Sequence, residues 1–338
     1  MNGIPEAERP DAQSRPEPLH QQAVEEHHAP VEEASIPVAA PPNTIDPELA
    51  TAPPPSSFLG TYASQPLPPP IRFPNFGDVG LVVVFLVFGW IGSGALLGTA
   101  LHFRLWGVSN VKQALNDIHY ALGSQAIWYL ISFTGCILLF PAIWRTGYFE
   151  GLEWNAGAAF RKRWRLFTAA FVCFLLAIAD GVLLPGPPDT PIDQVFRMPG
   201  AAWLLFAFGI TLAPFFEEMA FRGFLLPAFN TAVDWAAERT MHRPAPAPDE
   251  EGKTRWSIGA MVVGSVLTSI PFALMHAEQT GYSLGPFLLL ICVSLVLCWV
   301  RLSMRSLAAS TLVHSSYNLL LFSLMLAGTG GFKHLDKM

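Results

Sequence analysis

Residues 79–101, VGLVVVFLVFGWIGSGALLGTAL, contain no charged side chain over 23 positions. An α-helix rises 1.5 Å per residue, so about 20 apolar residues cross the roughly 30 Å hydrocarbon core of a bilayer. The stretch lacks the period-2 alternation of a barrel strand. It therefore predicts a membrane-spanning helix.

Six more apolar runs of similar length follow this first one. They cover residues 126–144, 166–184, 198–216, 257–275, 284–300 and 306–326. The composition agrees, because 51% of the chain is hydrophobic and only 14% is charged, whereas a soluble protein carries about 25% charged residues. We predict an all-α polytopic membrane helix bundle of about seven transmembrane helices.

Residues 1–75 have a different composition from the rest of the chain. They hold 17 of the 30 prolines and 10 of the 26 acidic residues, against 3 basic residues. Such a segment cannot bury enough apolar surface to fold. We predict a disordered, Pro-rich acidic tail at 1–75 and a transmembrane helix bundle at 76–330. No basic run is long enough to predict nucleic-acid binding.

The cysteines and the loop charges bear on the cellular setting. All four cysteines lie in apolar runs without CxxC spacing, so small buried side chains are expected rather than disulfides or a zinc ribbon.

Basic residues gather in alternate loops, at 145–165, 231–256 and 301–305. The positive-inside rule then places the tail in the cytoplasm. We predict an integral protein of the inner (plasma) membrane, with residues 231–256 as a flexible cytoplasmic loop.

The fourth run ends in a cluster of charges, Phe-Phe-Glu-Glu-Met-Ala-Phe-Arg at 215–222. Glu218 and Arg222 are four residues apart, so they share a helix face and can form an ion pair. Glu217 is rotated by about 100° from Glu218 and has Phe221 at i+4. The spacing therefore predicts two roles: Glu218 forms an ion pair with Arg222, and the Glu217 carboxylate remains available for chemistry. The alternative is that both glutamates mark a helix end at the headgroups.

Two further motifs place polar side chains within apolar runs. His276 closes the fifth run, four residues after Phe272, and taken alone it is more typical of a helix cap. His314 and Asn318 are four residues apart in the seventh run and share one face. Polar groups at membrane depth are costly, so they mark either a functional site or hydrogen bonds between helices.

These side chains fit more than one chemistry. A buried glutamate can take a proton from water, and histidine and asparagine can donate hydrogen bonds to an oxyanion, as amide hydrolysis requires. Glu217, His276 and His314 also match the ligand set of a catalytic zinc site. Intramembrane Glu and His build proton relays as well, although no inverted repeat is visible in the sequence.

The order of the three motifs, Glu-Glu-x-x-x-Arg, Phe-x-x-x-His and His-x-x-x-Asn, resembles the CAAX protease and bacteriocin-processing (CPBP, also called Abi) family of intramembrane proteases. The likeness covers about residues 198–328, and Gly223 and the segment 301–307 are similar too. Every motif position is filled, by Glu217, Glu218, Arg222, Phe272, His276, His314 and Asn318.

The resemblance implies an intramembrane endopeptidase acting on a membrane-associated peptide or protein within the lipid bilayer. Glu217 would activate water and His276 would help to hold it, while His314 and Asn318 would stabilise the oxyanion. Glu218, Arg222 and Phe272 would support the site. The family has been described both as metal-dependent and as metal-free. We expect a site without a metal cofactor. The alternative is a divalent zinc ion bound by Glu217, His276 and His314.

Straight helices would not bring these motifs together. His276 lies at the outer end of its run and His314 near the inner side of its own, so a helix must be broken, tilted or displaced. Pro214 and Pro271 each precede a motif and are the candidate positions for such a break. The alternative function is a non-catalytic peptide-binding membrane scaffold or an immunity-type protein. Neither the substrate nor the oligomeric state follows from the sequence.

Overall fold

The structure is a computed structural model that describes residues 72–184, 187, 190–198, 200–250 and 255–333. Most of the predicted tail at 1–75 lies outside these residues. Within the described part the secondary structure is helical and contains no strand. Seven segments are long and apolar enough to cross a membrane. The predicted all-α membrane bundle is confirmed, and the chain is an integral membrane protein.

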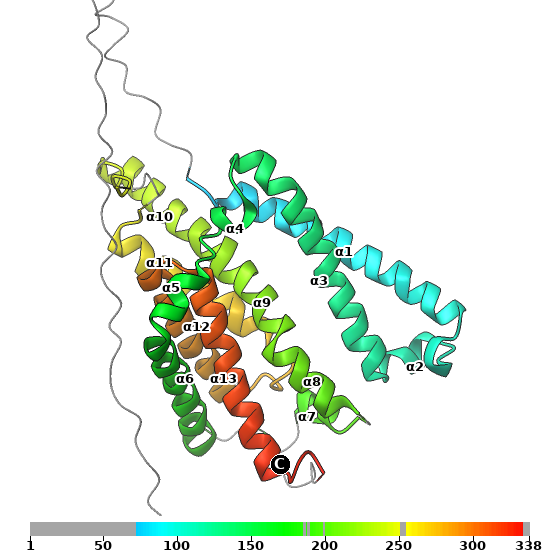
Figure 1. Cartoon of the computed structure of the whole chain (residues 1–338). Helices are drawn as coiled ribbons and strands as arrows, with labels where there is room; N and C mark the ends of the chain where they lie inside the picture. Colours follow the sequence, from blue (N-terminus) through cyan, green and yellow to red (C-terminus); the bar gives the residue numbers. More distant parts are fainter. Residues whose placement is uncertain (1–71, 185–186, 188–189, 199, 251–254, 334–338) are drawn as a thin grey trace, which may run out of the picture. The chain divides into compact units, whose positions relative to one another are not determined.

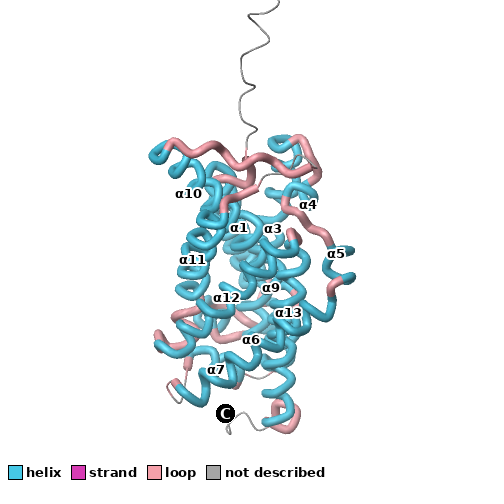
Figure 2. Tube along the Cα trace, turned by 90° about the vertical axis from the view of Figure 1, so that its left-hand side faces the viewer, coloured by secondary structure: helices cyan, strands magenta, loops and turns pink. Residues whose placement is uncertain are grey.

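Six of the seven spans are single helices that coincide with the predicted apolar runs, although α3 begins eight residues earlier than predicted. They are α1 (Phe76–His102), α3 (Ile118–Trp144), α6 (Arg163–Leu183), α11 (Ile258–Met275), α12 (Leu284–Met304) and α13 (Leu307–Gly328). Short helices connect them: η2 (Leu105–Gly107), α2 (Val111–Leu115), α4 (Tyr148–Gly151), α5 (Ala156–Arg161) and α7 (Pro191–Phe196). Figure 2 shows α4 and the loop after α10 at one end of the bundle, and α7 at the other.

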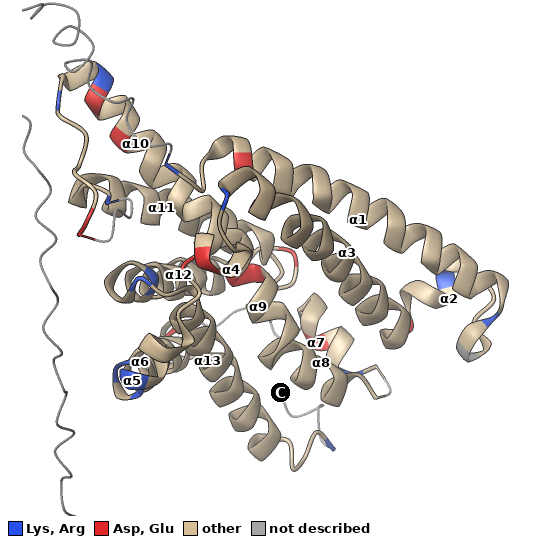
Figure 3. Ribbon diagram, turned by 45° about the horizontal axis from the view of Figure 1, so that its top comes forward, with Lys and Arg blue, Asp and Glu red and all other residues tan. Residues whose placement is uncertain are grey.

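Helices α1 and α3 pack closely side by side (Figure 1). The Trp128 indole donates to the Leu86 carbonyl at 2.7 Å, and the Ser132 hydroxyl donates to the Phe85 carbonyl at 3.2 Å. A Cβ at Gly89 would lie 2.8 Å from the Trp128 carbonyl oxygen, so only glycine permits this approach. Figure 3 shows few charged residues along either helix. Their outward apolar side chains are exposed, as contact with lipid requires.

The fourth span is a broken helix. It consists of α8 (Ala201–Ile210), α9 (Leu212–Glu218), a π-helical turn (Met219–Leu225) and α10 (Leu226–Met241). The chain breaks at Thr211, with φ −123° and ψ −81°. Pro214 has no N–H to donate to the Ile210 carbonyl, which explains the break at this point. The predicted break before the first motif is therefore present.

The second candidate position has no break, and one expected loop is partly helical. α11 runs through Pro271 to Met275 without a break, because a membrane helix tolerates the loss of one backbone bond when its neighbours hold it. The predicted loop at 231–256 is helical as far as Met241, because polarity alone does not end a helix and no Gly or Pro occurs between 231 and 243. Asp234 of α10 then accepts from the Ser257 backbone N–H at 3.0 Å and from its hydroxyl at 2.5 Å.

An ionic cluster ties the α4–α5 connection to the junction of α12 and α13. Arg301 and Arg305 donate to the two oxygens of Glu153 at 2.7 and 2.9 Å, and Arg305 also pairs with Asp249. The Leu307 backbone N–H donates to the Glu153 carbonyl at 3.0 Å. Burial raises the pKa of Glu153, but Arg301 and Arg305 more than offset this and hold the pKa below its ordinary value.

The second half of the bundle packs α6, α12 and α13 around a continuous apolar core. Three cysteines, at 136, 173 and 298, are buried as expected, and all four thiols are free. Cys292 is exposed instead, because it faces outward from α12, where the surrounding lipid is as apolar as a protein core.

Candidate active site

The Glu218–Arg222 pair lies at the centre of the site, and both side chains are fully buried. Arg222 Nη1 donates to Glu218 Oε1 at 2.9 Å, so the ion pair predicted from the spacing is present. Arg222 Nη2 donates to the Ser294 hydroxyl at 2.7 Å and to its carbonyl at 3.2 Å. The guanidinium lies 4.4 Å from the centre of the buried Phe272 ring. The π-helical turn carries Arg222, so α9, α11 and α12 all meet at this group.

His314 reaches both glutamates from α13. Its Nδ1 lies 3.0 Å from Glu218 Oε1, and its Nε2 lies 3.8 Å from Glu217 Oε2. The side chain is 6% exposed and therefore almost fully buried. Glu218 thus contacts Arg222 and His314 through the same oxygen.

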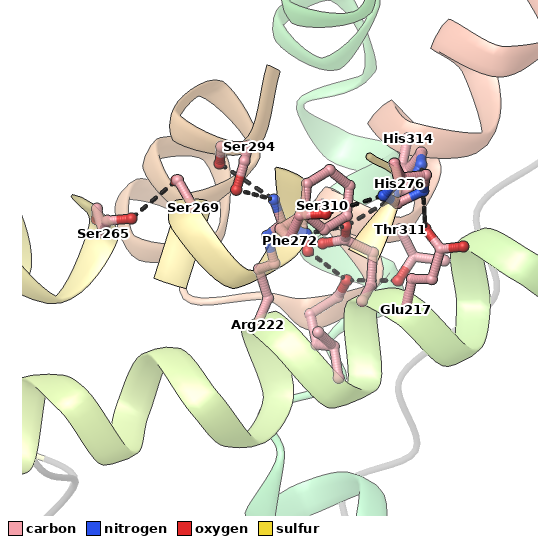
Figure 4. A network of polar contacts seen from close by, with 12 residues as sticks. Glu217, Arg222, Ser265, Ser269, Phe272, His276, Ser294, Ser310, Thr311 and His314 are labelled. Carbon is pink, nitrogen blue, oxygen red and sulfur yellow. Dashed lines mark hydrogen bonds and ion pairs between the residues drawn. The ribbon is translucent and has the colours of Figure 1, made fainter. Parts of the chain in front are cut away.

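His276 reaches Glu217 from the end of α11. It is the residue that caps this helix, and its Nδ1 lies 2.9 Å from the Phe272 carbonyl oxygen. Its Nε2 lies 3.8 Å from Glu217 Oε2, the distance at which His314 also lies. Figure 4 shows Glu217 facing both imidazoles, with Arg222 and Ser294 on the other side of Phe272.

The hydrogen-bond partners assign the tautomers of both histidines. A carbonyl oxygen only accepts, so Nδ1 of His276 carries a hydrogen. Nδ1 of His314 faces a carboxylate, which also accepts. Each neutral imidazole therefore presents an Nε2 lone pair toward Glu217, and it becomes a donor there only when protonated.

Asn318 lies one turn after His314 but faces the break in the fourth span. Its Nδ2 donates to the Gly209 carbonyl at 2.7 Å. Among the described residues, no hydrogen bond joins Asn318 to Glu217. The structure thus brings Glu217, Glu218, Arg222, Phe272, His276 and His314 together, and it places Asn318 at their edge.

A cavity of about 340 Å³ lies beside Glu217 and His276. One wall is formed by α9 and the π-helical turn, and the opposite wall by α1 and α3, which carry Val82, Leu86, Gln125, Trp128, Tyr129 and Phe133. Most of the lining is aromatic or aliphatic. A polar pair at the edge of an apolar cavity is typical of a ligand site.

Sequence reasoning missed the partners that come from other helices. Ser294 is a lone hydroxyl in an apolar run, which is a weak signal that its contact with Arg222 now explains. Ser310, one turn before His314, interacts electrostatically with Glu218, although its hydroxyl donates to the Leu307 carbonyl at 3.1 Å. Tyr129 and Gln125 of α3 had no motif to mark them.

The fit to a metal ion depends on Glu217, His276 and His314. Zinc ligands lie about 2.0–2.2 Å from the ion, so two ligands of a tetrahedral zinc lie about 3.4 Å from each other. Glu217 Oε2 lies 3.8 Å from each Nε2, slightly farther than that. In the part of the chain that the structure describes, no group of three His, Cys, Asp or Glu side chains is arranged to hold a metal. As they lie, the three groups are slightly too far apart to hold a zinc ion, and the mechanism below has no step through a metal.

Comparison with known proteins bears on the segment that contains these motifs. Comparison with curated proteins and with solved structures gives no match. A scan of protein families matches residues 199–320 to the type II CAAX prenyl endopeptidases described as Rce1-like. The matched segment runs from the Pro that precedes α8 to the middle of α13, and it contains every motif position. The resemblance seen in the motifs is confirmed: residues 199–320 are an Rce1-like domain of the CAAX intramembrane protease family.

Proposed function

We propose that the protein is an intramembrane endopeptidase that hydrolyses a peptide bond in a membrane-associated peptide or protein. The observation that carries the proposal is the convergence of Glu217 Oε2 with Nε2 of His276 and of His314, at 3.8 Å each. This convergence lies at the wall of an apolar cavity. Family similarity supports the class of reaction, and the roles of the individual residues are our proposal.

The 3.8 Å separations favour a water molecule held between the three groups. They are too long for direct hydrogen bonds, but a water about 2.8 Å from each atom fits the gap. Such a water donates one hydrogen to Glu217 and the other to the neutral Nε2 of one histidine. The other histidine holds the water only as a donor, in its protonated form. One lone pair of the water is then directed away from these groups, toward the cavity.

The reaction follows from this position. Glu217 takes a proton as the water oxygen attacks the carbonyl carbon of the peptide, and a tetrahedral oxyanion forms. Glu217 then passes that proton to the departing amine as the C–N bond breaks. Water supplies the hydroxyl of the new acid and one hydrogen of the new amine, so the atoms balance.

The oxyanion needs hydrogen-bond donors. A carboxamide has two N–H groups, and Asn318 uses one of them on Gly209. The second is available to the oxyanion, together with Nε2–H of His314 when that ring is protonated. One such donor is worth about 10²–10³ in rate. Glu218, fixed by Arg222, holds the His314 ring in orientation.

From the loop charges we also propose that the protein lies in the inner (plasma) membrane, with its N-terminal tail in the cytoplasm. A scaffold that binds peptides without cleaving them is the alternative function. It has the same cavity but no need of a proton acceptor at Glu217. The two functions therefore differ in their response to one substitution.

The test is cleavage of a library of membrane-tethered peptides by purified protein, with and without a chelator. Wild type should cleave, and Glu217→Gln should lose at least about 10²-fold in rate, because an amide cannot take the proton. Glu278→Gln is the matched control, since Glu278 is exposed and lies two residues beyond His276. Peptide binding without cleavage by both wild type and Glu217→Gln would favour the scaffold. Loss of cleavage on chelation would show that a metal takes part in the reaction and that the mechanism above is wrong.

A further inference from the structure

The cavity beside Glu217 contains few polar groups with unused hydrogen-bonding capacity. The Trp128 indole and the Ser132 hydroxyl already donate to carbonyls of α1. The Tyr148 hydroxyl lies 3.6 Å from the Met219 sulfur. Apart from the groups already assigned to catalysis, Tyr129 and Gln125 are the polar residues of the α3 wall that can still bind a ligand.

Tyr129 is held in place on the side of the cavity that faces Glu217. Its ring packs against Phe216, with the ring centres 4.8 Å apart, and Phe216 precedes Glu217 in the chain. Tyr129 also interacts electrostatically with Glu217. Gln125 Nε2, one turn earlier on α3, donates to the phenolic oxygen at 2.9 Å.

The contact with Gln125 determines what Tyr129 can offer. A phenol both donates and accepts, and Gln125 occupies the accepting side. Among the described residues, Gln125 is the one hydrogen-bond partner of the phenol. The O–H hydrogen is therefore available to a molecule in the cavity.

A peptide in this cavity would need such a donor. Its backbone carbonyls lose their hydrogen bonds to water on entering an apolar space, which is unfavourable unless a new donor replaces them. We propose that Tyr129, positioned by Gln125, donates its phenolic hydrogen to a backbone carbonyl oxygen of the peptide that binds beside Glu217. The identity of the ligand as a peptide rests on the proposed function. The residue belongs to α3, outside the segment that matches the family.

The test measures peptide binding separately from cleavage. The probe is a library of fluorescent decapeptides tethered to vesicles by a lipid chain, and the protein carries Glu217→Gln so that bound peptides stay intact. Adding Tyr129→Phe, which removes only the hydroxyl, should raise the Kd of the bound peptides about 5- to 100-fold. Gln125→Leu should raise it less, since it loosens the phenol without removing it. Tyr148→Phe is the matched control from the same cavity and should leave the Kd unchanged.

A modified peptide distinguishes a direct contact from a structural effect. Each carbonyl of the tightest binder is replaced in turn by a CH₂ group, and one replacement should abolish the difference in Kd between the proteins with and without Tyr129→Phe. Three results would overturn the inference: an unchanged Kd for Tyr129→Phe, an equal loss for Tyr148→Phe, or no bound peptide at all.

The same measurements separate this inference from the proposed function. If peptides bind through Tyr129 but wild type cleaves none of them, the inference stands and the peptidase proposal fails. If cleavage depends on Glu217 but Tyr129→Phe changes neither binding nor cleavage, the peptidase proposal stands and the inference fails.

Discussion

Replacing Arg222 by methionine tests whether the buried ion pair organises the site or only stabilises it. Arg222 and Glu218 are both fully buried, and Arg222 also bonds to Ser294. Methionine fills a similar volume without charge and leaves the Glu218 carboxylate buried beside His314 alone. Removing one partner of a buried pair costs about 3–5 kcal/mol. We expect Arg222→Met to lower the unfolding temperature by several degrees or more.

The double variant Glu218→Gln with Arg222→Met separates stability from activity. No charge is left unpaired, so most of the lost stability should return. Nδ1 of His314 then faces a neutral amide oxygen. A hydrogen bond to a charged group is worth about 1.5–3 kcal/mol and a neutral one about 0.5–1.5 kcal/mol, and a difference of about 1–2 kcal/mol corresponds to about 5- to 30-fold in rate.

Thermal unfolding in detergent and initial cleavage rates measure the two effects on the same samples. The expected pattern is a destabilised single variant and a double variant that is stable but slow. Arg222→Met with wild-type stability, or a double variant as unstable as the single one, would refute the account of the pair. A double variant with wild-type rate would show that the charge of Glu218 does not act through His314.

Two further predictions concern packing and pH. Gly264→Ala should destabilise the fold by about 1–3 kcal/mol, because the added methyl overlaps the side-chain oxygen of Asn230. The control Gly80→Ala adds a methyl in open space and should leave the unfolding temperature unchanged or higher. Equal effects of the two substitutions on the unfolding temperature would contradict this packing. The lowered pKa of Glu153 means that its stabilising effect is present above the ordinary pKa of 4.5 and is lost as the pH falls below it. The difference in unfolding temperature between wild type and Glu153→Gln should therefore be largest at neutral pH and shrink below about pH 4.5; a constant difference would disprove the linkage.

The membrane spans could be predicted because a bilayer imposes length and apolarity on each of them. α11 and α13 begin and end within about two residues of the predicted runs. α3 was underestimated, since its first two turns contain His119, Ser124 and Gln125 and look like a loop. Asp117 caps this helix by accepting from the backbone of His119. Such a cap is evident only once the helix axis is known.

The sequence predicts those contacts of the site that form within one helix, because residue spacing determines which side chains share a helix face. The spacing alone gave the ion pair of Glu218 and Arg222 and the common face of His314 and Asn318. Ser294 and Tyr129 reach the same centre from helices with no motif, so their contacts depend on how the helices pack. The direction in which Asn318 donates depends on the break at Thr211, which exposes the Gly209 carbonyl.

The ionic cluster around Glu153 implies that the segment of family similarity is not a self-sufficient module. Arg301 lies inside that segment and is 3% exposed, yet its partner Glu153 lies more than 40 residues before the segment begins. A protein cut down to residues 199–320 would keep a buried cation and lose its counterion. The segment of family similarity is therefore shorter than the part of the chain that folds as a unit. A protein truncated to residues 199–320 should not fold stably.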